Sequence, residues 1–234
     1  MVPSQDEARE CSSPDALAAN SWLMNAMRNL VYVFIRWWLR LAFRFDVAGA
    51  EVFQRTRQFI LISNHSSHLD AVCLLAALPA KLRNRCFSAA ASDYFYTNIV
   101  MEFIARLLAN TFPFQRRTDP KEGLEFCARI LERGDSLIFF PEGTRSVTGE
   151  LQPFKKGVGA LVQGTPYPVI PAYLRGAHRV LGKGKVAPRV ARLHLRFGTP
   201  QVFTDVPASD EAADLIASRL HDAVEALGQQ DASG

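Results

Sequence analysis

QFILISNHSSHLD, residues 58–70, is an apolar run that ends abruptly in polar residues. Its first six residues predict a buried strand, because they are mostly apolar, few in number and bounded by polar residues. His65 follows that strand, and Asp70 comes five residues later within a predicted helix. In α/β sheets the ends of strands are where ligands bind. The stretch therefore indicates both a fold class and the place of a site within it.

A second stretch of the same kind is SLIFFPEGTRS, residues 136–146. SLIFF predicts another buried strand, and polar residues follow it at once. Strand-like and helix-like segments alternate along the rest of the chain. Further strands are predicted at 86–91, 168–173 and 190–198, and helices at 69–79, 94–109, 119–133, from 157 onward and at about 209–227. This alternation predicts an α/β fold, with a layered, mostly parallel sheet flanked by helices.

No internal repeat, heptad array or low-complexity linker interrupts this pattern, so we expect one folded domain. We expect residues 1–21 to form a flexible N-terminus, 22–45 an amphipathic membrane-associating helix, 46–227 the domain and 228–234 a tail. The first twenty residues lack the features of a secretory signal. No uncharged apolar run is long enough for a conventional transmembrane helix.

Residues 22–45 combine arginine with aromatic residues and contain no acidic residue. On a helical wheel at about 100° per residue, Arg28, Arg36, Arg40 and Arg44 share one sector. The apolar residues opposite them are Leu30, Phe34, Trp38, Leu41 and Phe45. Such a helix suits a bilayer interface, and the presence of all three tryptophans of the chain favours that interpretation. The alternative is a helix that packs its apolar side on the core and leaves its arginines in water.

Composition narrows the class of protein only slightly. Hydrophobic residues make up 48% and charged residues 21% of the 234 residues, as in a globular protein with a real core. The net charge of +4 and the pI near 9.0 suit an anionic membrane, a phosphorylated ligand or nucleic acid. Nucleic-acid binding has little support, because no recognisable motif interleaves basic with exposed aromatic residues. The four cysteines form no C-x-x-C pair, and Cys73 and Cys127 lie in apolar helical patterns. We therefore expect buried free thiols, a reducing compartment and no metal site.

His65 and Asp70 are the candidates for proton transfer. A carboxylate beside the imidazole would fix the ring tautomer and stabilise the cation that forms when the ring accepts a proton. The chain has no G-x-S-x-G motif to supply a serine nucleophile, which favours direct attack by a substrate hydroxyl. His68 is expected to support the turn. The alternative is that His65 only caps a helix and Asp70 is a solvated surface group.

The residues after the second strand are candidates for anion binding. Gly143 allows the backbone to approach a ligand closely, and Thr144 offers a hydroxyl and a backbone N–H. Arg145 supplies a planar fork for a phosphate. Glu142 would orient Arg145 or accept a proton from a substrate hydroxyl. The alternative is an ordinary surface turn with a Glu–Arg pair.

Together the two segments resemble the lysophosphatidic acid and glycerol-phosphate acyltransferase family. His65 and Asp70 match its H-x-x-x-x-D motif, and residues 140–146 match its F-P-E-G-T-R-S motif at every position. The resemblance continues through Phe154-Lys155-Lys156-Gly157 and through the strand Pro168-Val169-Ile170-Pro171. It covers roughly residues 46–205.

The resemblance implies that His65 deprotonates an acceptor hydroxyl, which attacks the thioester of acyl-CoA or acyl carrier protein, while Asp70 orients the ring. The acceptor that it implies is a membrane lipid, by default 1-acyl-glycerol-3-phosphate. The substrate-binding residues that it implies are Arg116, Glu142, Gly143, Thr144 and Arg145. It implies peripheral or monotopic association with the cytoplasmic face of an anionic membrane. No cofactor or metal is implied beyond the acyl donor as co-substrate.

One motif departs from the family pattern, which often reads G-x-x-F-[IV]-D-R. The corresponding residues 110–116 read NTFPFQR, and only Arg116 keeps its match. An O-acyltransferase acting on another lyso-lipid, such as a lyso-aminolipid, therefore stays open. Two other classes also stay open, a non-catalytic lipid-binding membrane module and a thioesterase. Basic residues that could contact the phosphates of coenzyme A or an acidic carrier protein are Lys155, Lys156, Arg179, Lys183, Lys185 and Arg189.

Overall fold

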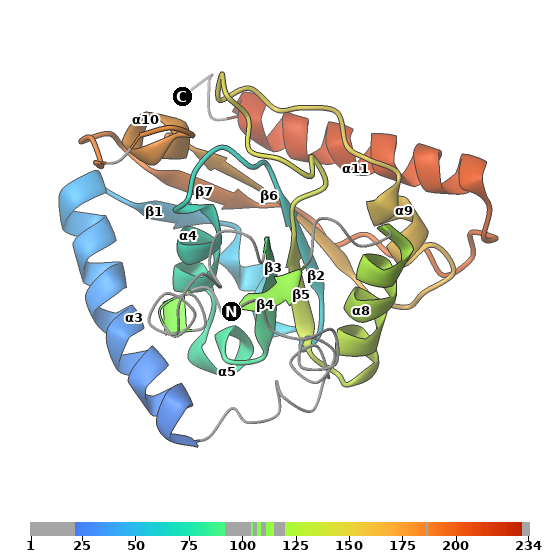
Figure 1. The fold of residues 1–234 in the computed structure, drawn as a ribbon, viewed down its shortest axis with the longest axis horizontal. Coiled ribbons are helices and arrows are strands. Elements are labelled where there is room, and N and C mark those ends of the chain that lie inside the picture. Colours follow the sequence, from blue (N-terminus) through green and yellow to red (C-terminus); the bar gives the residue numbers. More distant parts are fainter. Residues whose placement is uncertain are drawn as a thin grey trace, which may run out of the picture.

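The computed structural model describes residues 22–91, 104, 107–108, 111–114, 120–185 and 187–230. Within them seven strands form one sheet in the order β1-β7-β6-β2-β5-β3-β4 (Figure 1). The strands are β1 Asp46–Ala48, β2 Ile60–Ser63, β3 Cys86–Ala91, β4 Thr111–Phe114, β5 Ser136–Phe139, β6 Val169–Arg175 and β7 His194–Phe197. Only β6 and β7 pair antiparallel, and the other pairs are parallel. The prediction of a mostly parallel sheet is confirmed.

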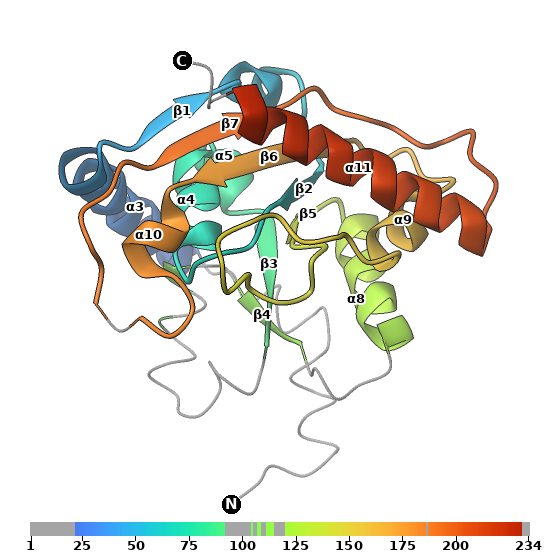
Figure 2. The ribbon, with the colours of Figure 1, turned by 90° about the horizontal axis from the view of Figure 1, so that it is seen from above.

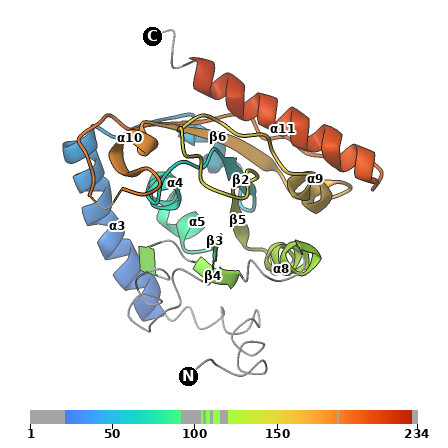
Figure 3. The same cartoon turned by 45° about the horizontal axis from the view of Figure 1, so that its top comes forward.

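Helices cover both faces of the sheet, as predicted (Figure 3). The helical elements are α3 Trp22–Phe43, η1 Ala50–Gln54, α4 Asp70–Ala77, α5 Ala80–Arg83, α8 Pro120–Glu132, α9 Gly157–Val162, α10 Ala177–Leu181 and α11 Asp210–Gln230. The strands β1 and β4 and the short elements η1, α5 and α10 were not predicted from the sequence. Most of the helix predicted at 94–109 lies outside the described residues, as do residues 1–21. Helix α11 continues three residues past the predicted end at 227.

Strand β2 is buried along its whole length, because its alternating side chains enter two different cores. Ile60 and Ile62 pack in one core with side chains of α8, α9 and α11. Leu61 packs in the other core, with side chains of α3, α4 and α10. Figure 2 shows α11 lying along β6, against which it packs. The central strand is therefore fixed from both sides, and so is the point where it ends.

Helix α3 turns a different side to the protein from the one that the sequence predicted. Arg28, expected on an outward polar sector, is 1% exposed. It lies on the inward side with Tyr32 and Leu39, which are fully buried. These residues are spaced four and seven apart, so they fall on one side of the helix. The prediction was wrong for Arg28, because periodicity alone does not say which sector of a helix meets the core.

The outward side of α3 is apolar as well. Its large exposed apolar residues are Trp22, Leu23, Met27, Leu30, Val33, Phe34, Trp37, Trp38 and Leu41. The helix therefore packs on the core and also keeps a second apolar side exposed, so the two alternatives weighed from the sequence are not exclusive. Within the described residues, none of the helices combines the length and the apolar character needed to cross a bilayer.

Helices α9 and α11 meet with their backbones in close contact at Gly159. A Cβ atom built on Gly159 would lie 1.9 Å from the carbonyl oxygen of Ala213. We expect Gly159→Ala to lower the free energy of unfolding by about 1–3 kcal/mol, because the helices would have to separate. Gly157→Ala in the same helix is the matched control, since its nearest neighbour would be 3.7 Å away. Chemical denaturation measures both, and equal stability of the two variants would contradict the proposed close contact.

Candidate active site

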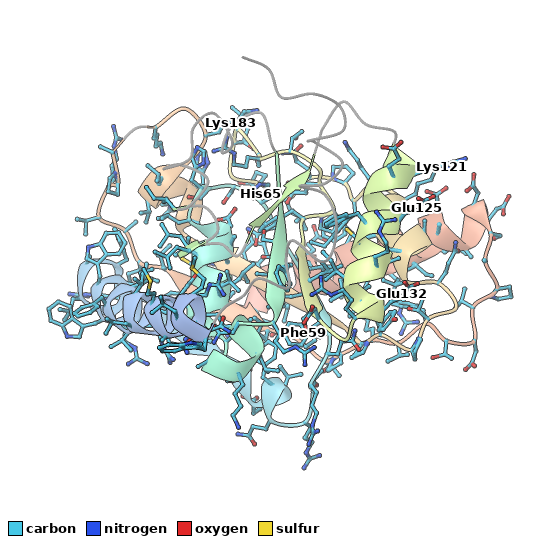
Figure 4. All side chains as sticks on the ribbon, turned by 60° about the horizontal axis from the view of Figure 1, so that its bottom comes forward. Phe59, His65, Lys121, Glu125, Glu132 and Lys183 are labelled. Atoms are coloured by element: carbon cyan, nitrogen blue, oxygen red, sulfur yellow. The ribbon has the colours of Figure 1, made fainter. Side chains whose placement is uncertain are left out.

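Two loops meet at the carboxyl ends of the neighbouring parallel strands β2 and β5. We call residues 64–69 the histidine loop and residues 140–150 the arginine loop. Figure 4 shows His65 and Phe59 at opposite ends of β2. The arrangement agrees with the expectation that polar residues after buried strands gather at one edge.

His65 and Asp70 form a direct pair. The Nδ1 atom of His65 lies 2.9 Å from Oδ2 of Asp70, which is 1% exposed at the first turn of α4. The same oxygen accepts the backbone N–H groups of Ser66 at 2.7 Å and of Ser67 at 2.8 Å. Three donors and the N-terminus of the helix thus hold the carboxylate in place. With Nδ1–H donated to Asp70, Nε2 carries the lone pair that can accept a proton.

The plane of the His65 ring is set by an aromatic neighbour. The ring stacks on Phe140, with centroids 4.1 Å apart and an interplanar angle of 18°. Phe140 belongs to the arginine loop, so the two loops fix the ring from two directions. A base held at one nitrogen and across its face needs little reorganisation before it acts.

Two further hydrogen bonds join the loops through the backbone of His65. Its N–H donates to Oε1 of Glu142 at 2.7 Å, and its carbonyl oxygen accepts the N–H of Ser146 at 2.8 Å. Glu142 is 4% exposed. Burial raises the pKa of Glu142 to about 7, although the N–H groups of His65 and Gln152 act in the opposite direction. The structure thus places the Glu142 carboxylate against the peptide group of the catalytic candidate.

Asn64 anchors the histidine loop to the strand on the other side. Its side-chain Oδ1 accepts the N–H of Leu174 at 2.8 Å, and its Nδ2 donates to the Leu174 carbonyl at 3.1 Å. The amide therefore continues the pairing of β2 with β6 one step past the end of β2. Sequence reasoning missed Asn64, and the signal available was a polar amide directly after a mostly apolar strand.

Helix α10 supports both loops. The hydroxyl of Ser67 donates to the carbonyl of Leu181 at 2.7 Å. The ring of His178 fills the space between Gly149 and Gly182, since a Cβ at either glycine would lie within 3.0 Å of that ring. Gly149 also has a φ of 90°, which favours glycine. These contacts were not predicted, because α10 itself was not.

The turn at Gly143, Thr144 and Arg145 is the open part of the site. Gly143 and Thr144 are exposed and Arg145 is half-buried. A Cβ built on Gly143 would lie 2.7 Å from Nζ of Lys155, so that cation sits over the turn. Gly143 has a φ of 73°, which a residue with a side chain rarely adopts. Arg145 in the turn and Lys155 over it therefore place two positive charges near the histidine loop.

His68 lies close to these groups without being a second base. Burial, followed by the positive charges of Arg145 and His65, lowers the pKa of His68. The ring is therefore neutral under ordinary conditions, which suits the supporting position predicted for it. Arg116, the remaining predicted substrate-binding residue, lies outside the described residues.

The site can accept a proton and bind an anion. His65 presents a basic nitrogen, and Arg145 and Lys155 provide positive charge beside it. Within the described part of the chain, potential metal ligands gather only at His221, Asp222 and Glu225 on α11. Those side chains face solvent or are half-buried, and they belong to neither loop.

Several known proteins are similar to this chain. A 1-acyl-sn-glycerol-3-phosphate acyltransferase of Brassica napus is 29% identical over 70% of this chain and 45% of its own length. One of Cocos nucifera is 31% identical over 66% of this chain and 48% of its own length. The chain thus spans about half the length of these relatives. The crystal structure of the 1-acyl-sn-glycerophosphate (LPA) acyltransferase of Thermotoga maritima has the same fold, with a TM-score of 0.67, 22% identity and coverage of 94% of this chain and 84% of that one.

The family match includes both loops of the site. Residues 44–175 match the family model described as Acyltransferase. This range is more than half of the chain and contains the histidine loop, the arginine loop, Lys155 and the β6 strand that Asn64 contacts. The protein belongs to the acyltransferase family.

Proposed function

We propose that the protein transfers a fatty acyl group from a thioester, acyl-CoA or acyl carrier protein, to the free hydroxyl of 1-acyl-glycerol-3-phosphate. The observation that carries the proposal is the Asp70–His65 pair held beside the cationic turn of the arginine loop. The names of the relatives from Brassica napus and Cocos nucifera support this acceptor. Such a substrate has one hydroxyl and one phosphate on a short glycerol frame, which suits a base and two cations placed close together.

In this mechanism Nε2 of His65 takes the proton of the acceptor hydroxyl as its oxygen attacks the thioester carbonyl carbon. The carbon–sulfur bond then breaks, and the imidazolium returns the proton to the departing thiolate. Asp70 accepts the Nδ1–H bond throughout and stabilises the transient positive charge on the ring. Both reactants carry their own reacting groups, so the reaction needs no covalent intermediate with the enzyme.

The acceptor phosphate binds at the turn of the arginine loop. Arg145 offers two parallel N–H donors, and Lys155 adds a second positive charge over Gly143. Thr144 and the backbone of Gly143 are close enough to the same place to add donors. Arg116 is the further residue that the family motif assigns to this phosphate. Glu142 does not contact the phosphate; its carboxylate fixes the backbone of His65 to the arginine loop.

The outward side of α3 attaches the protein to the cytoplasmic face of an anionic membrane, where its substrate lies. Trp37 is 65% exposed and Leu30 is 60% exposed, so both would be removed from water by a bilayer interface. Arg36, Arg40 and Arg44 lie at the edge of this apolar side and would meet lipid head groups. Attachment of this kind is peripheral or monotopic.

We expect His65→Ala to lower the rate of acyl transfer by about 10²–10⁴-fold, because general-base catalysis typically contributes that much. Asp70→Asn should reduce kcat with little change in KM, since the ring loses its orienting carboxylate. The assay uses labelled acyl-CoA or acyl carrier protein with a panel of lyso-lipids that includes a lyso-aminolipid, and resolves the products by mass. His194→Ala, at the β1–β7 pair, is the control and should keep the activity.

Three results would contradict the proposal. Full acyl transfer by the His65→Ala variant would show that His65 is not the general base. Release of free fatty acid at a rate independent of any lyso-lipid would identify a thioesterase. Binding of lyso-lipid without any transfer by the unaltered protein would identify a non-catalytic lipid-binding module. Transfer to a lyso-aminolipid alone would keep the mechanism and replace the acceptor.

The raised pKa of Glu142 makes stability depend on pH. The folded protein binds this proton more tightly than the unfolded chain, so the associated stabilisation is complete below about pH 4.5 and is lost as the pH rises to about 7. Relative to Glu142→Gln, which keeps an oxygen to accept the His65 N–H, the protein should lose about 3 kcal/mol of unfolding free energy across that range. Chemical denaturation of both proteins at a series of pH values measures the difference. Parallel curves would show that the carboxyl titrates normally.

The apolar side of α3 can be tested apart from catalysis. Leu30→Ser with Phe34→Ser should weaken binding to anionic vesicles by more than about tenfold, because each side chain loses about 1.5–3 kcal/mol of burial. The fold should be unchanged, since both side chains are exposed in the protein. Leu215→Ser, at an exposed position on α11, is the control. Co-sedimentation measures the binding, and unchanged binding by the double variant would end the membrane assignment of α3.

A further inference from the structure

The segment between α10 and β7 is basic, and most of its described residues are exposed. We call residues 183–192, KGKVAPRVAR, the basic loop; it contains four basic residues and no acidic one. The surrounding sequence strengthens the bias, because residues 151–204 contain no Asp or Glu at all. Lys183, Arg189 and Arg192 are exposed, and within residues 120–185 and 187–230 of the structure no ion pair involves any of them. Among the described residues, no ion pair compensates the positive charge of these three side chains.

The position of the basic loop links the site to α3. It starts just after Gly182, which pairs with Ser67 of the histidine loop, and Figure 4 shows Lys183 at the same end of the molecule as His65. The residue that follows it, Leu193, donates its N–H to the carbonyl of Phe43 at the end of α3, at 3.0 Å. Figures 2 and 3 both show the segment running past this end of α3 before it enters β7.

The base of the loop is fixed while its tip faces outward. Nζ of Lys185 donates to the carbonyl of His178 at 2.8 Å, and the N–H of Arg189 donates to the carbonyl of Val180 at 2.8 Å. These bonds tie the loop to α10. The next residue, Val190, is 89% exposed between Arg189 and Arg192. An apolar side chain is thus held in water at the centre of a cationic segment.

We propose that the basic loop is a second membrane-contacting segment, in which Val190 enters the interface and Lys183, Arg189 and Arg192 contact anionic lipid head groups. The inference rests on the proposed membrane attachment of α3. A lipid surface is favoured over an acidic protein because the loop runs past the carboxyl-terminal end of α3, where Leu41 is exposed beside Arg40 and Arg44. Cationic residues around an apolar side chain are the combination that an anionic interface binds.

Membrane contact at two separate segments would orient the protein in a way that contact through α3 alone does not. A single helix with a broad apolar side still allows the attached domain to rock about the helix axis at the interface. Contact at α3 and at the basic loop would fix the protein about that axis and hold the His65 end of the sheet at a constant distance from the lipid. The basic loop would then act on the orientation of the enzyme, apart from its total affinity for the membrane.

Site-specific fluorescence tests the contact directly. Single cysteines replace Val190, Leu30 of α3 or Leu215 of α11 in a Cys11→Ser background, and each carries an environment-sensitive dye. The remaining cysteines are buried, and burial raises the pKa of the Cys73, Cys86 and Cys127 thiols, so they should stay unlabelled. Vesicles of equal parts phosphatidylcholine and phosphatidylglycerol should shift the emission to the blue at positions 190 and 30 and leave position 215 unchanged.

The outcomes separate the two proposals. A response at position 30 without one at 190 would overturn the basic loop as a contact and leave the attachment of α3 standing. An unchanged emission from the dye at position 30 would contradict the membrane attachment of α3 itself. A response at 190 to an acidic acyl carrier protein and not to vesicles would make the loop a protein-docking surface and overturn the proposal.

A charge variant gives an independent measurement. Arg189→Gln with Arg192→Gln should weaken vesicle binding by about fivefold for each residue removed. Arg55→Gln with Arg57→Gln removes the same charge from exposed positions just before β2, at the end of that strand opposite His65, and should leave the binding unchanged. Equal weakening by both pairs would show a general effect of net charge and would overturn the proposal.

Discussion

The peptide group of His65 is bonded on both sides to the arginine loop, and the rest of the site depends on this connection. Its N–H meets Glu142 and its carbonyl meets the N–H of Ser146. Both loops follow strands that are neighbours in the sheet, but neighbouring strands alone leave their terminal loops free to diverge. The bonds to one peptide group prevent this. A proton acceptor and a cationic turn then keep a constant separation, as the proposed substrate with its hydroxyl and its phosphate requires.

The central position of β2 explains why such a connection is stable. The strand lies between β5 and β6 and contributes to both cores, so its end is among the least mobile points of the fold. Asn64 ties the loop to β6, while Glu142 reaches it from the β5 side. Burying the Glu142 carboxyl costs stability when it is ionised. The fold carries this cost at the point where precision of geometry matters for the reaction.

The sequence allowed the core of this arrangement to be predicted. Apolar runs that stop at polar residues located β2, β5 and both loops, and a spacing of five located the pair of His65 with Asp70. Local patterns could not reveal roles that depend on distant partners. Asn64 and His178 act through β6 and α10, and nothing in their own neighbourhood names those partners. Thr111–Phe114 contains a proline and was not recognised as a strand, although an edge strand such as β4 tolerates one. Arg28 was misplaced because a helical wheel has no absolute orientation.

Helix α3 belongs to the folded domain and also carries an apolar surface that the domain leaves uncovered. The inward residues Tyr32 and Leu39 are part of one core, so the helix cannot be removed without exposing that core. Truncation to improve solubility would therefore cost the fold itself. In dilute aqueous buffer the uncovered sides of two copies would associate with each other, so purification calls for detergent or lipid from the first step. Aggregation without them would come from the native apolar surface and would not indicate misfolding.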